Sequence, residues 1–154
     1  MNNYQKYLKY KIKYLDLKYK QNGGTKIIRK KLNNYLPTPW LDWIEQGLKK
    51  YDGRLNRGSW KNIEVGDVIV WSDVGRNESS NPNKGKIVET KVTKLKYYPN
   101  FVEAFRDLGQ KMVPIKNITE EEVTAIYLKF FKKNDIKKYG AVAIGLKVIA
   151  SQKA

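Results

Sequence analysis

The chain has 154 residues, enough for one domain with a core of its own, and it contains no cysteine and no histidine. Their absence excludes disulfides, thiolate or imidazole catalysis, and metal sites built on those side chains, so we expect no metal and no cofactor. The formal net charge is +16 at pH 7, and residues 1–31 alone hold ten Lys or Arg against one acid, which predicts attraction to polyanions such as nucleic acid.

The amino-terminal segment, residues 1–24, has the pattern of a basic amphipathic helix that ends at Asn22-Gly23-Gly24. Its tyrosines and leucines form one stripe, and four lysines that would attract a polyanion gather on the opposite face: Lys6, Lys9, Lys13 and Lys20. The apolar stripe could pack on its own domain, on a protein partner, on an acidic membrane surface or beside RNA.

The first residues also bear on where the protein acts. The sequence has no stretch of about 18 apolar residues and no signal-peptide pattern, so we expect an intracellular protein that is neither membrane-spanning nor secreted. Residues 7–15, Tyr-Leu-Lys-Tyr-Lys-x-Lys-Tyr-Leu, resemble the opening of many proteins of giant DNA viruses. That resemblance implies a host cytoplasm, a viral factory or a virion as the location.

A basic linker, residues 25–35, leads into the predicted compact domain, residues 36–150. Thr38-Pro39 is typical of a helix start and predicts a short helix that ends at Gly47. Residues 49–56 alternate as a strand does, and a second strand, residues 68–71, follows the turn at Val65-Gly66-Asp67.

After a loop over residues 72–85, a third strand is predicted over residues 86–97, with Val88, Thr90 and Val92 on one side. The last segment, residues 140–150, alternates large apolar side chains with Ala and Gly, which indicates a further strand with one face in a core and the other against a close neighbour.

Two helices are predicted between these strands from their capping signatures. Asn100-x-x-Glu103 opens the first, which stops near Gly109, and Thr119-x-x-Glu122 opens the second, which extends to about Lys133. The element order is a helix, three strands, two helices and a strand. This order predicts an α/β (α+β) fold, a small, partly closed β-barrel flanked by helices, with an open α+β sheet as the alternative.

The motif Gly47-x-Lys49-x-x-Asp52-x-Arg54 resembles the Gly-x-Lys-x-x-Glu-x-Arg signature of the ASCH family of PUA-like small barrels. The resemblance continues through Gly66-Asp67, residues 92–105 and residues 140–144. It implies a PUA-like barrel with a cleft where the signature lysine, acid and arginine meet. It also implies a nucleic-acid partner, RNA more than DNA, with a nucleotide or a modified base in that cleft.

The chemistry of the three signature residues supports a ligand site. Arg54 offers a planar fork of donors, Lys49 is a point charge, and Asp52 can accept from an amino group or orient Arg54. In a regular strand Lys49 would point away from the other two, so their convergence needs a bend. A surface ion pair that braces a strand is the alternative; for a ligand site, we expect Arg54→Ala to weaken binding more than folding.

Other residues in and near the same basic stretch are candidate ligand contacts. Tyr51, Trp60 and Tyr98 could stack on bases, although most aromatic side chains of a small domain belong to its core. Arg57 adds a cation to the stretch.

Two other functions are compatible with the sequence. Some relatives look like amidohydrolases of acylated cytidine that use the signature lysine, a hydroxyl residue three positions on and a separate carboxylate. Here Asp52 takes the hydroxyl position, and the candidate catalytic residues are Lys49, Asp52 and Glu103, with Glu120 to Glu122 as further acids. An enzyme would be of the amidohydrolase or ribonuclease type without metal, Cys or His. The other alternative is a virion or scaffold protein whose basic tail docks a partner.

Overall fold

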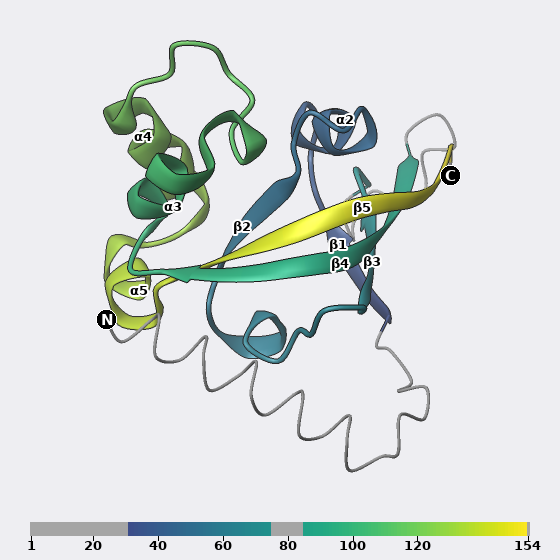
Figure 1. Ribbon diagram of the computed structural model, residues 1–154, viewed down its shortest axis with the longest axis horizontal. Helices are drawn as coiled ribbons and strands as arrows, with labels where there is room; N and C mark the ends of the chain where they lie inside the picture. The colour runs from purple at the N-terminus through teal and green to yellow at the C-terminus, as the bar shows by residue number, and fades with distance from the viewer. Residues whose placement is uncertain (1–30, 75–84, 154) are drawn as a thin grey trace.

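The computed structural model describes residues 31–74 and 85–153 (Figure 1). The predicted amino-terminal helix, with Lys6, Lys9, Lys13 and Lys20, lies outside the described residues, as does most of the predicted loop after residue 72. In the part of the chain that the structure describes, no helix is long and apolar enough to cross a membrane.

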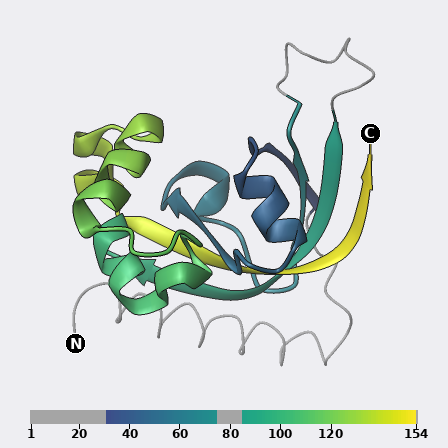
Figure 2. The same ribbon diagram turned by 90° about the horizontal axis from the view of Figure 1, so that it is seen from above.

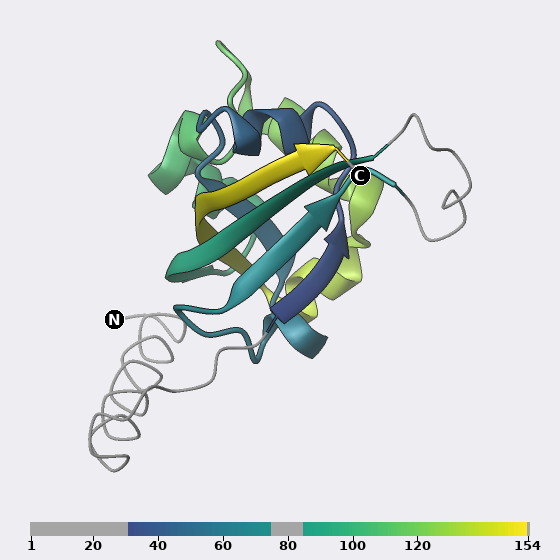
Figure 3. The same ribbon diagram turned by 90° about the vertical axis from the view of Figure 1, so that its right-hand side faces the viewer.

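Five strands form a single mixed sheet in the order β1-β3-β4-β5-β2. They are β1 (Lys31–Tyr35), β2 (Tyr51–Leu55), β3 (Val68–Ser72), β4 (Lys86–Tyr98) and β5 (Ala141–Lys153). β1 runs parallel to β3, and the other neighbouring pairs are antiparallel. Figure 3 shows β5, β4, β3 and β1 side by side. The mixed α+β fold predicted from the element order is confirmed.

The sheet is open, so the predicted barrel is wrong in its closure. The edge strands β1 and β2 do not pair with each other, and each has only five residues. Closure requires strands whose length, tilt and stagger match around the ring, which two short edges do not provide. The curvature comes instead from the 13-residue strands β4 and β5, which bend across the molecule (Figure 2), helped by register shifts at Glu89/Thr90 and Val92/Lys94.

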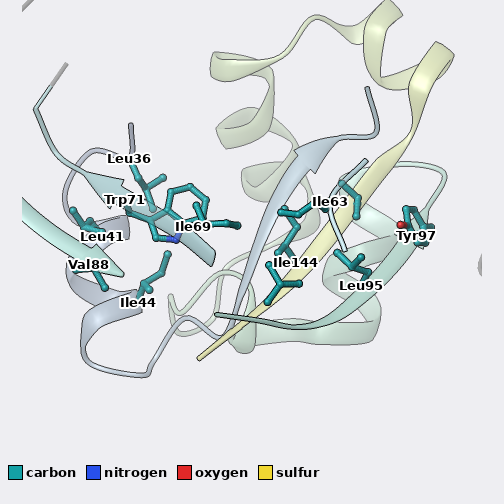
Figure 4. Packing of buried hydrophobic residues seen from close by; sticks show 12 residues of the cluster. Leu36, Leu41, Ile44, Ile63, Ile69, Trp71, Val88, Leu95, Tyr97 and Ile144 are labelled. Carbon is teal, nitrogen blue, oxygen red and sulfur yellow. The ribbon is translucent and has the colours of Figure 1, made fainter. Parts of the chain in front are cut away.

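The two faces of the sheet carry separate cores. On the inner face, alternate residues of β3, β4 and β5 meet α2 (Trp40–Glu45), and Leu41, Ile44 and Ile69 gather round the fully buried Trp71 (Figure 4). The Trp71 indole donates from Nε1 to the Thr90 hydroxyl at 2.9 Å, so its one polar atom is satisfied inside the core.

On the outer face, helices cover one end of the sheet (Figure 1). They are α3 (Phe101–Leu108), α4 (Glu120–Phe130) and α5 (Lys133–Tyr139), and two 3-10 turns, η1 (Gly58–Trp60) and η2 (Gly109–Lys111), complete the elements. Ala141 and Ala143 are buried on this face, while Val142 and Ile144 are buried on the other. The predicted alternation of β5 is therefore confirmed, and its small residues let the helices approach the sheet.

Three local features differ from the sequence predictions. The end of the predicted linker is β1, which pairs with β3 from Lys31 to Tyr35. α2 begins at Trp40, with Pro39 rather than Thr38 at its N-cap and no side-chain cap. The second predicted helix ends at Phe130, and a separate short helix, α5, follows because the backbone is extended at Phe131 and Lys132.

Candidate functional site

A cavity of about 210 Å³ is lined by residues of both edge strands of the sheet, β1 and β2. Its wall joins the end of β1, the start of α2, the strand β2 and the last turn of α4, which are far apart in the sequence. The residues that line it are Tyr35, Leu36, Pro37, Trp40, Lys49, Asp52, Gly53, Arg54, Ile126, Tyr127, Phe130 and Phe131. The three signature residues Lys49, Asp52 and Arg54 thus share one cavity.

Lys49 lies in the loop before β2, with only 3% of the residue exposed. Its Nζ donates to the carbonyl oxygens of Tyr51 at 2.7 Å and of Met112 at 2.6 Å, and it lies 5.4 Å from the centre of the Trp40 ring. An ammonium group has three N–H donors, so a third remains for a group in the cavity. β2 begins at Tyr51, so Lys49 lies before the strand and its side chain does not follow the alternation of the strand. Lys49 can therefore point to the same cavity as Asp52 and Arg54 without the bend expected from the sequence.

Burial shapes the acid–base behaviour of Lys49. Removal from water lowers the pKa of Lys49 to about 8, with the Asp52 carboxylate opposing this shift and the Arg54 guanidinium adding to it. The amine is therefore mostly charged at pH 7 and becomes neutral not far above that pH. Such a group can hold an anionic or carbonyl oxygen in its charged form and accept a proton in its neutral form.

Asp52 and Arg54 form a buried ion pair on the inner face of β2. Arg54 donates from Nε to Asp52 Oδ2 at 2.6 Å, and their side chains are only 17% and 5% exposed respectively. The guanidinium carbon of Arg54 lies 5.0 Å from the Trp60 ring and 5.2 Å from the Trp71 ring. The ion pair and the two rings hold the guanidinium in place, and its terminal N–H groups have no acceptor among the described residues.

The rest of the cavity wall is apolar and aromatic. Tyr127 is buried and stacks on Phe101 with ring centres 4.2 Å apart. Burial raises the pKa of the Tyr127 hydroxyl, and the negative charge of Asp52 raises it further. Gly53 makes room for both side chains, because a Cβ there would lie 3.2 Å from the Phe101 ring and 3.2 Å from the Tyr127 hydroxyl oxygen. Tyr35 and Phe130 are 47% and 54% exposed, so aromatic surface also borders the opening of the cavity.

The other candidate ligand contacts do not line this cavity. Tyr51 is buried against the helices, Trp60 stacks on Trp71, and Tyr98 donates its hydroxyl to Asp107. Arg57 pairs with Asp135 at 3.5 Å and lies over Tyr139.

The downstream acids also lie elsewhere. Glu103 and Glu120 are exposed and paired with Arg106 at 2.8 and 2.7 Å, and Glu122 completes the capping box at Thr119. Among the described residues that line the cavity, Asp52 supplies the one carboxylate.

Sequence reasoning missed the aromatic wall. Tyr35 stood in the predicted linker, Trp40 on an ordinary helix face, and Tyr127, Phe130 and Phe131 within or just past the second predicted helix. No local pattern marks these residues, since their proximity depends on how α4 packs beside β2.

The model of the ASCH domain family matches residues 35–150, most of the chain. The chain belongs to the ASCH domain family. The match includes every element from α2 to α5 and most of β5, so the cavity lies inside the ASCH domain. The cavity residues Lys49, Asp52 and Arg54 are the signature positions identified above.

Two solved structures are similar to this ASCH protein. The crystal structure of hypothetical protein PH0355 is 28% identical, with a TM-score of 0.65, and the match covers 77% of this chain and 99% of the other. The solution NMR structure of protein PF0455 from Pyrococcus furiosus is 26% identical, with a TM-score of 0.60, and the match covers 77% and 97%. Comparison with curated proteins gave no match. These comparisons do not support the resemblance of residues 7–15 to giant-virus proteins.

Proposed function

We propose that this ASCH protein binds RNA and holds one unpaired base in the cavity between β2 and α4. The observation that carries the proposal is that the cavity wall has a polar part and an apolar part. Lys49, Asp52 and Arg54 supply the polar groups, and most of the remaining wall is apolar or aromatic. A base has the matching division, because its edge carries donors and acceptors and its faces stack on aromatic rings.

The polar groups can read a base edge. Arg54 has terminal N–H donors to offer, Lys49 has a third N–H, and Asp52 has a second carboxylate oxygen that accepts no hydrogen bond from the described residues. A base that presents an acceptor next to a donor can therefore bond to cation and carboxylate together. The ion pair and the two hydrogen bonds from Lys49 to backbone carbonyl oxygens hold these side chains in place, which reduces the entropy lost when a ligand binds.

The size of the cavity limits the ligand. At about 210 Å³ it is smaller than the roughly 300–1,000 Å³ of most small-molecule sites. It suits one ring system and excludes an oligonucleotide, so the neighbouring nucleotides must lie outside. Residues 32–154 carry 21 basic and 14 acidic side chains, an excess that favours the phosphates of such a strand.

The exposed aromatic residue at the opening gives a matched test. We expect Phe130→Ala to weaken binding of a short single-stranded RNA by about tenfold or more, since stacking on one base contributes about 1–3 kcal/mol. Leu128→Ala is the control, because Leu128 is on the same helix, is 44% exposed and does not line the cavity. Fluorescence anisotropy measures both affinities. Equal losses in the two variants would mean that Phe130 acts through the helix and not through the cavity.

A hydrolase of acylated cytidine is the second candidate, favoured by the lowered pKa of Lys49. A neutral amine at the cavity can act as base or nucleophile. This candidate predicts release of the acyl group as a carboxylic acid, with kcat/KM rising as the pH increases through about 8, and no turnover by Lys49→Arg. Chromatography of the nucleoside before and after incubation measures it. If the acylated cytidine binds at pH 9 and is not cleaved, the cavity is a binding site alone.

A further inference from the structure

Three exposed lysines lie together on the outer face of the sheet, beyond the helices. Lys91 on β4 is directly opposite Lys147 on β5, and Lys94 is opposite Gly145, which precedes Lys147 by two residues on β5. Residues paired across strands share a face of the sheet, so all three side chains project to the same side. We name Lys91, Lys94 and Lys147 the lysine face.

Acidic side chains on this surface pair with other lysines. Glu89 pairs with Lys31 at 3.5 Å, and Asp107 pairs with Lys96 at 3.6 Å, at the two ends of the row. Within the described residues, none of the three members of the lysine face has an ion-pair partner within 4.0 Å. The positive charge at the middle of the row is therefore uncompensated.

This arrangement is unfavourable for the fold itself. Like charges directly opposite each other on neighbouring strands destabilise a sheet, and Lys91 and Lys147 are such a pair. Gly145 is buried beneath Thr93 and Lys94, since a Cβ there would meet Thr93 Oγ1 at 3.0 Å and Lys94 Cβ at 3.1 Å. The packing of the domain gives no reason for this concentration of charge, whereas a bound polyanion would.

We propose that the lysine face binds the phosphate backbone of an RNA strand, as a second contact surface separate from the cavity. The occupant must be anionic. Residues 1–30 carry nine basic residues and one acidic residue, so this segment would be repelled, and the same face of a second copy would be repelled too. The inference rests on the proposed RNA binding and not on the cavity, because backbone contacts need no base.

The test compares salt dependence in two triple variants of equal charge. In Lys91→Gln/Lys94→Gln/Lys147→Gln, the slope of log Kd against log salt for a 12-nucleotide oligouridylate should fall by about 2, as expected for three lost phosphate contacts on a single strand. The control, Lys116→Gln/Lys133→Gln/Lys137→Gln, removes the same charge from exposed lysines on the helical side and should leave the slope nearly unchanged. Arg54→Lys, which alters the cavity, should weaken binding at every salt concentration with little change of slope.

The results separate the two proposals. Equal slopes in the two triple variants would overturn the proposal that the lysine face binds RNA. This holds if both slopes fall because the net charge is lower, and also if neither slope changes. A wild-type protein that binds no oligouridylate would overturn RNA binding and the lysine face together. A triple variant with a normal slope beside a weakened Arg54→Lys would overturn the lysine face alone. Thermal melting gives an independent check, because Lys147→Gln should melt at the same or a higher temperature, and a sharp fall would show a structural role instead.

Discussion

Arg54→Ala is expected to lower the free energy of unfolding by about 3 kcal/mol and to remove most of the RNA affinity. The cost to folding arises because the Asp52 carboxylate, 5% exposed, would lose its partner while staying buried, and an uncompensated buried charge is strongly destabilising. A surface ion pair, the alternative that the sequence left open, would give a smaller cost to folding, under about 1 kcal/mol. Urea denaturation and RNA titration measure the two effects.

Two further variants separate stability from recognition. Asp52→Asn/Arg54→Ala also removes the carboxylate that Arg54→Ala leaves buried without a partner. This double variant should recover much of the lost stability without recovering RNA affinity. Arg54→Lys keeps a cation beside Asp52 but loses the planar fork, so it should fold well and bind about tenfold or more weakly, since one bidentate contact contributes about 1–3 kcal/mol. Full affinity in Arg54→Lys would show that RNA binding does not use the planar fork of Arg54.

The stability of the protein should rise between pH 8 and 10.5 through Lys49. Its pKa is lowered from an ordinary value of 10.5 to about 8 in the folded chain. Below pH 8 both folded and unfolded chains hold this proton, whereas in the interval above only the unfolded chain does, so stability increases as pH rises. The gain is on the order of 3 kcal/mol across the interval.

Comparison with two variants isolates this gain from other titrating groups. Lys49→Met lacks the titrating amine, so the difference in unfolding free energy between wild type and Lys49→Met should move in favour of wild type as pH rises from 8. Lys50→Met, at the exposed neighbouring position, should show the same pH dependence as wild type. If wild type and Lys49→Met change in parallel, the Lys49 amine is not buried as a charged group.

Local signals in the sequence were sufficient for elements that stabilise themselves. Asn100 accepts from the Glu103 N–H, and Thr119 and Glu122 form a full capping box, as their spacing predicts. The alternating patterns of β4 and β5 also appear as predicted, because one face of each strand must be buried.

Features that depend on distant contacts could not be predicted. The strand β1 forms through its pairing with β3. The sequence of Lys31–Tyr35 has no pattern that distinguishes a strand from the basic linker before it. The openness of the sheet depends on the relative position of β1 and β2, which no local pattern records. For the site, the motif brought together Lys49, Asp52 and Arg54, but Trp40 and Phe130 join them only through tertiary packing.

An NMR titration of the ¹⁵N-labelled protein with a short single-stranded RNA tests the central claim most directly. The cavity proposal predicts that the Arg54 Nε–H resonance and the backbone amides of Asp52 and Gly53 shift progressively and saturate with the same Kd as RNA binding measured by anisotropy. Saturable RNA binding that shifts resonances of exposed lysines and leaves Arg54, Asp52 and Gly53 unchanged would contradict it.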